Sequence, residues 1–162
     1  MEQQVKLVPY GVADFAMVIE QNLYYVDKTM FIPELEKQPR NLFFIRPRRF
    51  GKSIFLSMLY SYYDCTQSHK FQSLFGNLWI GQHPTPLQGK YQVLFLDFSQ
   101  ITGNIDKLET KFNSYLSINL DAFVRQYSEY YQAEMEEILA QEDFEEKMEL
   151  IFKAAKAHQY HL

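Results

Sequence analysis

A cluster of basic residues around one Gly-Lys-Ser tripeptide carries the clearest chemical pattern in the sequence. The run Arg46-Pro-Arg-Arg-Phe-Gly-Lys-Ser53 fits the phosphate-binding motif G-x-x-x-x-G-K-[ST] at every fixed position except the first. At that first position Arg46 stands where glycine is expected. In such a loop, backbone N–H groups and a helix N-terminus surround the phosphates of a nucleotide. The run therefore predicts a P-loop that holds ATP and Mg²⁺.

Each residue type in this loop suits a role in phosphate binding. Gly51 has no side chain, so the backbone can approach a phosphate closely. Lys52 can reach the β- and γ-phosphates as a point charge and is the candidate catalytic residue. Ser53 offers its hydroxyl to Mg²⁺ and is the candidate metal ligand. The predicted nucleotide site comprises Arg46, Pro47, Arg48, Arg49, Phe50, Gly51, Lys52, Ser53 and Ile54. Arg48 and Arg49 either touch phosphate or pair with carboxylates inside the fold.

A P-loop needs a strand before it and a helix after it, and the flanking sequence predicts both. Asn41–Ile45 is a continuous apolar run of the length of a buried parallel strand. Ser53–Tyr63 lacks glycine and proline and predicts a helix, and Tyr91–Asp97 predicts a second strand. Asn104–His158 is almost wholly helical by its apolar spacing. Together these elements predict an α/β, P-loop NTPase-like fold with a parallel sheet and a helical C-terminal half.

The remaining segments are shorter or irregular. Short helices are expected over Asp14–Glu20 and over Met30–Lys37, where Pro39 ends the second one. The stretch Gln72–Lys90 is rich in glycine and proline and predicts a loop, with a small strand around Leu78–Ile80.

Composition and charge narrow the class of protein. Hydrophobic residues make up 47% and charged residues 22%, which is typical of a globular chain. The net charge of −4 argues against a general nucleic-acid binder, although a specific nucleic-acid partner stays open. Acidic residues dominate Glu129–Glu149, which predicts a solvated helix face. The chain has one cysteine, no leader-like apolar run and no stretch long enough for a membrane span, so a cytoplasmic protein is expected.

Two blocks of sequence resemble a known family. Tyr25-Val-Asp-Lys-Thr29, followed by Phe44-Ile-Arg-Pro-Arg-Arg-Phe-Gly-Lys-Ser-Ile-Phe-Leu-Ser-Met-Leu59, is similar to the predicted AAA-ATPase-like family of bacteria. Arg46 departs from the general P-loop motif but agrees with that family's version of it. The resemblance implies a P-loop ATPase domain that binds Mg-ATP.

The resemblance also implies that residues 1–162 form the N-terminal part of one such domain. Within it, residues 1–40 would be a lead-in, 41–103 the P-loop strand and helix with the second strand, and 104–162 a helical segment. Members of the family continue into a Leu-Ile-Asp-Glu-Tyr-Asp strand resembling a Walker B element, and often into a domain similar to restriction nucleases. Neither appears in this sequence. We therefore expect an incomplete sheet, weak ATP hydrolysis by this chain alone, and either self-association or low stability caused by an unpaired sheet edge.

Several interpretations stay open on the sequence alone. The chain is an ATPase, a nucleotide-binding switch or scaffold without catalysis, or a non-catalytic interaction fragment. Asp97 either lines the nucleotide site or caps the next turn. Asp27, Lys28 and Thr29 either contact the nucleotide or cap a helix, with Thr29 as the N-cap. The aromatic side chains of Tyr60, Tyr62 and Tyr63 are expected in the core more than in a stacking platform.

Overall fold

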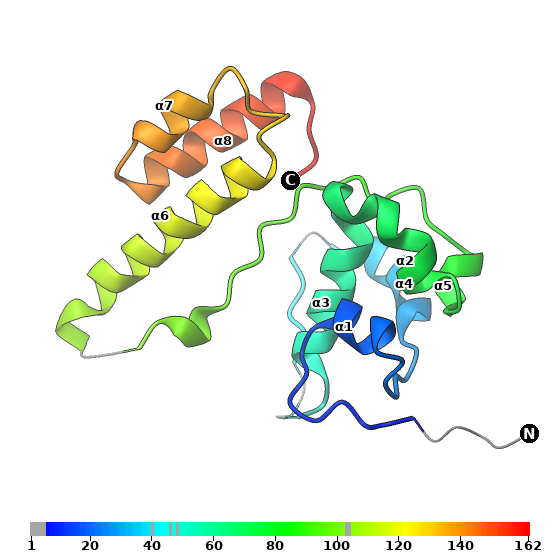
Figure 1. Cartoon of the computed structure of the whole chain (residues 1–162). Helices are drawn as coiled ribbons and strands as arrows, with labels where there is room; N and C mark the ends of the chain where they lie inside the picture. Colours follow the sequence, from blue (N-terminus) through cyan, green and yellow to red (C-terminus); the bar gives the residue numbers. More distant parts are fainter. Residues whose placement is uncertain (1–5, 40, 46, 48, 103–104) are drawn as a thin grey trace, which may run out of the picture. The chain divides into compact units, whose positions relative to one another are not determined.

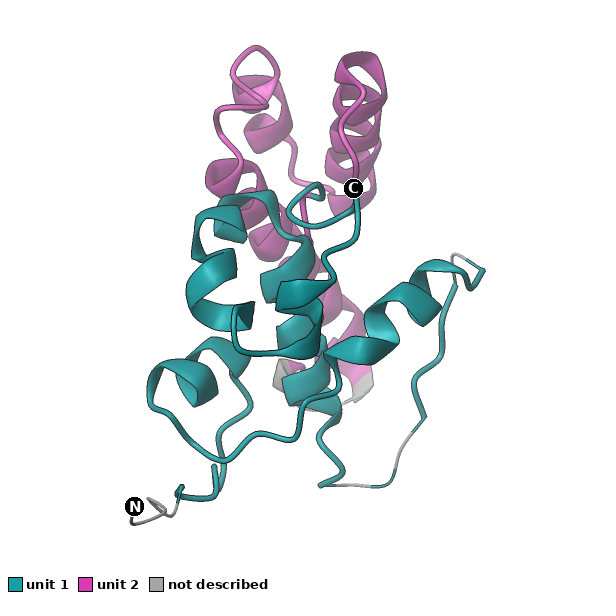
Figure 2. Ribbon diagram, turned by 90° about the vertical axis from the view of Figure 1, so that its right-hand side faces the viewer, with its two compact units in different colours: residues 1–91 teal, residues 92–162 magenta. Residues whose placement is uncertain are grey.

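The computed structural model describes residues 6–39, 41–45, 47, 49–102 and 105–162. The chain divides into two compact units, Met1–Tyr91 and Gln92–Leu162 (Figure 2). Helices joined by irregular segments make up both units (Figure 1), and the described residues contain no β-strand. Asp64 and Tyr91 form an isolated parallel bridge. The predicted α/β fold with a parallel sheet is therefore wrong, and the structure is helical.

The first unit is built from short helices. In chain order they are α1 (Phe15–Glu20), the 3-10 helix η1 (Thr29–Phe31), α2 (Ile32–Glu36), α3 (Lys52–Tyr63), the 3-10 helix η2 (Cys65–Lys70), α4 (Phe71–Phe75) and α5 (Trp79–Gln82). The three helices predicted before Asp64 are confirmed, each with small shifts at its ends. The small strand predicted around Leu78–Ile80 is wrong, because the chain turns into α5 at Trp79.

One aromatic-rich core holds this unit together. Helix α3 contributes Phe55, Met58 and Tyr62, which recur at helical spacing and are buried. The ring of Phe75 in α4 stacks on Phe15 in α1 with centroids 5.0 Å apart, and Tyr62 meets Phe75 edge-on at 5.5 Å. Such ring pairs stabilise a core by about 0.5–1.5 kcal/mol beyond the burial of their area. The core position predicted for Tyr62 is confirmed, and this packing fixes the direction of α3.

The second unit contains the longest helices of the described chain. Its elements are the 3-10 helices η3 (Phe98–Gln100) and η4 (Ile105–Lys107), then α6 (Leu108–Gln126), α7 (Met135–Ala140) and α8 (Phe144–His158). The predicted helical C-terminal half is confirmed. Asp143 caps α8, since its Oδ1 accepts hydrogen bonds from the N–H groups of Glu145 at 2.7 Å and Glu146 at 3.3 Å. No helix in the described ranges is long and apolar enough to cross a membrane.

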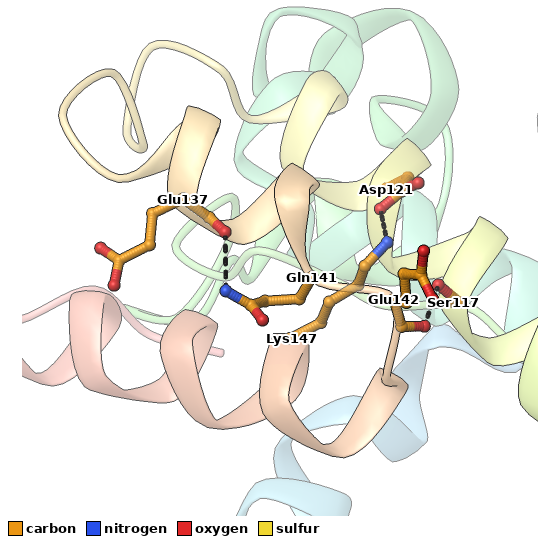
Figure 3. A network of polar contacts seen from close by, with 6 residues as sticks. All are labelled: Ser117, Asp121, Glu137, Gln141, Glu142 and Lys147. Carbon is orange, nitrogen blue, oxygen red and sulfur yellow. Dashed lines mark hydrogen bonds and ion pairs between the residues drawn. The ribbon is translucent and has the colours of Figure 1, made fainter.

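A polar network connects α6 to the turn between α7 and α8 (Figure 3). Lys147 in α8 is only 3% exposed and forms an ion pair with Asp121 in α6. The hydroxyl of Ser117, also in α6, donates to the carbonyl of Glu142 at 3.5 Å. The side-chain amide of Gln141 donates to the carbonyl of Glu137 at 3.3 Å. The carboxylate of Asp121 compensates the buried ammonium of Lys147, which would otherwise be costly, and the other two hydrogen bonds hold the turn before α8.

The segment expected as the P-loop strand is irregular. Phe43 is 92% exposed and Ile45 is 86% exposed, so the apolar run is not buried as a central strand would be. A strand exists only where a neighbouring strand accepts and donates its backbone hydrogen bonds. In the described part of the chain no other segment pairs with Asn41–Ile45. The prediction of a buried strand at Asn41–Ile45, which is based on apolar composition alone, is therefore wrong.

The segment expected as the second strand has different hydrogen-bond partners. The N–H of Val93 donates to the hydroxyl of Tyr127, the residue after α6, at 2.8 Å. The N–H of Asp97 donates to the hydroxyl of Tyr115 in α6 at 2.7 Å. Tyr91 forms the isolated bridge with Asp64, and tyrosine hydroxyls are the partners of two later N–H groups, so the rest of Tyr91–Asp97 runs as an irregular segment.

Candidate functional site

The predicted P-loop ends in a left-handed turn at the start of α3. Gly51 is the N-cap of α3 and has φ 76° and ψ 26°. Arg49 also has a positive φ of 66°. A left-handed conformation costs an L-residue about 1–2 kcal/mol, which explains the glycine at position 51. Turns that contain such residues can direct successive N–H groups to one side and form anion-binding concavities. Arg46 and Arg48 lie outside the described residues.

The N-terminus of α3 has the features of an anion site. The helix is 12 residues long, and the N–H groups of Ser53 and Ile54 precede the bond that the N–H of Phe55 donates to the carbonyl of Gly51 at 3.0 Å. Gly51 supplies no side chain to cap them. The helix dipole adds partial positive charge at this end. The side chain of Ser53 is exposed, and that of Ile54 packs against the core. This end of α3 therefore favours a negatively charged ligand.

Two ammonium groups lie beside this turn. The Nζ of Lys52 donates a hydrogen bond to the carbonyl of Pro47 at 3.1 Å, so its side chain folds back along the loop. The Nζ of Lys28 lies 3.6 Å from the point that a Cβ on Gly51 would occupy. The loop lysine is the one that the motif predicts. Lys28 comes from more than twenty residues earlier and adds a second positive charge at the same glycine.

The neighbours of Lys28 have structural roles. One carboxylate oxygen of Asp27 accepts from the N–H of Thr29 at 2.8 Å and from its hydroxyl at 2.7 Å. The other oxygen accepts from the N–H of Trp79 at 2.7 Å. The hydroxyl of Thr29 accepts in turn from the N–H of Ile80 at 3.1 Å. The predicted N-cap at Thr29 is therefore wrong. Lys28 stands at the N-cap of η1 without a side-chain cap, and the side chains of Asp27 and Thr29 together attach α5 to the segment that carries Lys28.

Tyr25 packs the same segment against the core. Its ring meets Phe15 edge-on with centroids 5.2 Å apart. Burial raises the pKa of the Tyr25 hydroxyl well above its ordinary value, and the nearby carboxylate of Asp27 raises it further. The phenol thus stays neutral at physiological pH. The segment from Tyr25 to Thr29 is anchored at both ends, so the position of Lys28 beside the loop is built into the fold.

A pocket of about 390 Å³ lies next to the loop. Its apolar wall consists of Phe31, Leu35, Phe44, Phe50 and Phe55. The rings of Phe44 and Phe55 stack with centroids 4.9 Å apart. Lys28, Glu34 and Gln38 complete the lining. Sequence analysis missed this pocket because its residues come from three separate segments, and Phe50 alone belongs to the predicted site.

Asp97 has a local role in the second unit. Its Oδ1 accepts from the N–H of Ser99 at 3.0 Å, so it caps η3 as one of the two interpretations predicts. The loop residues belong to Met1–Tyr91, and Asp97 belongs to Gln92–Leu162.

Comparison with known protein families gives the class of this chain. Residues 9–161 match the family described as "Predicted AAA-ATPase", and the chain belongs to this family. The resemblance seen in the sequence is thus confirmed at the level of the family.

A protein from Azotobacter chroococcum mcd 1, described as "Uncharacterized protein in vnfD 5'region", is 49% identical over 55 residues. This alignment covers 33% of the chain and 11% of that protein, so the chain matches only a small part of its relative's length. No solved structure matches the chain.

Proposed function

We propose that this chain binds ATP with Mg²⁺ through the loop that precedes α3. The observation that carries the proposal is the left-handed turn at Gly51, where the N-terminus of α3 meets the ammonium groups of Lys52 and Lys28. A helix N-terminus that opens from a glycine turn is a common site for phosphate. Family membership supports an ATPase-like protein in general terms, and the loop supplies the specific contacts.

The phosphates would accept hydrogen bonds from the first N–H groups of α3. Lys52 would exchange the carbonyl of Pro47 for phosphate oxygens, a change from a neutral acceptor to a charged one. Hydrogen bonds between charged partners are about twice as strong as neutral ones, so this exchange favours the bound state. Arg49 adds positive charge to the same turn.

Mg²⁺ would bind between the phosphates and the hydroxyl of Ser53. Magnesium usually keeps several of its waters and takes one or two protein ligands together with phosphate oxygens. The exposed side chain of Ser53 on the first turn of α3 meets that need. In phosphoryl transfer the protein acts mainly by positioning the nucleotide and stabilising charge, and Lys52 is the proposed catalytic residue for that role.

Calorimetric titration with Mg-ATP of the wild type and of Lys52→Ala tests the proposal. Loss of one charge-assisted hydrogen bond, worth about 1.5–3 kcal/mol, should weaken binding by about tenfold or more. The circular dichroism spectrum should not change, because Lys52 is not part of the buried core.

Lys90→Ala is the matched control. Lys90 is an exposed lysine of the same unit, and it precedes Tyr91, which pairs with Asp64 at the C-terminal end of α3. A helix of this length separates its two ends by about 18 Å, so this charge is remote from the loop. Equal affinities of the wild type and Lys52→Ala for Mg-ATP would contradict the proposal.

A further inference from the structure

The pocket beside the loop is lined by aromatic side chains that leave much of their surface uncovered. Phe31 is 53% exposed, Phe44 is 40% exposed and Phe50 is 63% exposed. Three large apolar side chains gathered around one hollow leave an apolar surface that a ligand can cover. The pocket volume of about 390 Å³ lies within the range of small-molecule sites, about 300–1,000 Å³.

This pocket is continuous with the proposed phosphate site. Phe50 directly precedes Gly51, and Phe55 lies within the first turns of α3. Lys28 lines the pocket while its ammonium group lies close to Gly51. A molecule whose phosphates contact the N-terminus of α3 would therefore have its remaining part beside the pocket.

The chemistry of the lining selects a flat aromatic ring with a polar edge. Phenylalanine rings stack on nucleobases, and each such contact contributes about 1–3 kcal/mol. The amide nitrogen of Gln38 donates one hydrogen bond to the carbonyl of Glu34 at 3.4 Å, and its second N–H and its amide oxygen are the donor and acceptor types that the edge of adenine can bind. The carboxylate of Glu34 is compensated by an ion pair with Lys37 at 2.8 Å, which limits its repulsion of a nearby anion.

From these contacts we propose that the pocket between η1, α2 and the loop binds the adenine base of the nucleotide, with Phe31 and Phe50 stacking on it. This inference rests on the proposed binding of ATP at the loop. It adds a second determinant of affinity, one that recognises the base and not the phosphates. ATP should accordingly bind more tightly than inorganic tripolyphosphate, which has the phosphates alone.

The test compares Mg-ATP with magnesium tripolyphosphate in calorimetry on the full chain. Phe31→Ala removes one stacking ring without opening the core, because Phe31 is about half exposed. We expect its affinity for ATP to fall by about fivefold or more, while its affinity for tripolyphosphate stays at the wild-type value. Phe43→Ala is the control, since Phe43 is 92% exposed and does not line the pocket.

The outcomes separate this inference from the proposed function. Equal wild-type affinities for ATP and tripolyphosphate would overturn the base pocket and leave the phosphate site standing. The base pocket would also be overturned if Phe31→Ala lowered the affinity for ATP and the affinity for tripolyphosphate equally. The same holds if Phe31→Ala lowered the affinity for ATP no more than Phe43→Ala does. Failure of the wild type to bind either ligand would refute the phosphate site, and the base pocket with it.

Discussion

The two units of this chain differ in how much of their backbone is hydrogen-bonded within long helices. In Gln92–Leu162, α6 and α8 are 19 and 15 residues long, so most backbone groups are satisfied within helices. In Met1–Tyr91 the helices are shorter, and polar side chains such as those of Asp27 and Thr29 bind the backbone of the turns. Irregular segments held by side chains leave turns and pockets, and the first unit, with its shorter helices, has more of its chain in such segments.

The two units also differ in whether aromatic rings gather around a pocket. In the first unit rings pack against rings, as Phe15, Tyr62 and Phe75 do, and further rings line an open pocket. In the second unit the hydroxyls of Tyr115 and Tyr127 bind the backbone of the segment before η3. Both uses occur in both units, since the N–H of Thr85 donates to the hydroxyl of Tyr62 at 2.8 Å and the rings of Phe123 and Tyr127 pack with centroids 4.7 Å apart. The pocket lined by several rings is the feature of the first unit that can offer aromatic surface to a ligand.

The largest expected effect is in the second unit. Asp121→Ala would leave the ammonium of Lys147 buried without its carboxylate, and breaking such a pair costs about 3 kcal/mol of the free energy of unfolding. Hydrogen–deuterium exchange of the backbone amides should become faster in α6 and α8, while the exchange rate in α3 should not change. A combined Asp121→Ala and Lys147→Met variant removes the buried charge and should recover most of the loss. Equal loss of protection in α3 would show that the two units do not unfold independently.

A smaller effect is expected in the first unit from Asp27→Ala. This carboxylate accepts three hydrogen bonds, and its loss should lower the free energy of unfolding by about 2 kcal/mol. Exchange should increase at α5 and around Lys28. Asp14→Ala removes only the exposed cap of α1 and should lower the free energy of unfolding by about 1 kcal/mol. If urea titration gives the two variants the same stability, Asp27 does not have the structural role assigned to it.

The smallest expected effect is a change in how the free energy of unfolding depends on pH. Burial raises the pKa of the Tyr63 hydroxyl far above its ordinary value of 10.0, and the carboxylate of Glu36, which accepts its hydrogen bond at 3.0 Å, raises it further. Because the folded pKa exceeds the unfolded one, this contribution to stability is complete below about pH 10 and decreases as the pH rises towards the folded pKa. Tyr63→Phe should therefore be less stable at neutral pH but lose less stability above about pH 10.

Urea titrations of the wild type and of Tyr63→Phe at a series of alkaline pH values measure this difference. Tyr24→Phe is the control, because Tyr24 lies in the same unit and is exposed. Parallel stability curves for the wild type and Tyr63→Phe above pH 10 would contradict the expected titration.

Helix positions could be predicted from local sequence. The lack of glycine and proline in Ser53–Tyr63 predicts a helix, and α3 spans Lys52–Tyr63. The acidic residues of Glu129–Glu149 predict a solvated surface, and Glu136, Glu137 and other members of this run are exposed. These features depend on neighbours within a few turns, so local pattern is sufficient to find them.

The strands could not be predicted correctly, because a strand depends on its partners. The runs Asn41–Ile45 and Tyr91–Asp97 have the composition of buried strands, yet no described segment pairs with the first one. In the second run, Val93 and Asp97 bind tyrosine hydroxyls that lie 34 and 18 residues further along the chain. Which group reaches a given N–H is a property of the tertiary structure, and composition carries no information about it.

The sequence by itself determined that Lys52 and Ser53 follow a glycine where a helix begins, because that motif is local and its chemistry follows from residue type. Only the tertiary structure decided that Lys28 joins Lys52 at this turn, while Asp27 and Thr29 bind α5. It also decided that rings from η1 and from the segment before the loop enclose one pocket with Phe50. The reason is that these contacts bring together residues far apart in the chain, and their geometry depends on how the core packs.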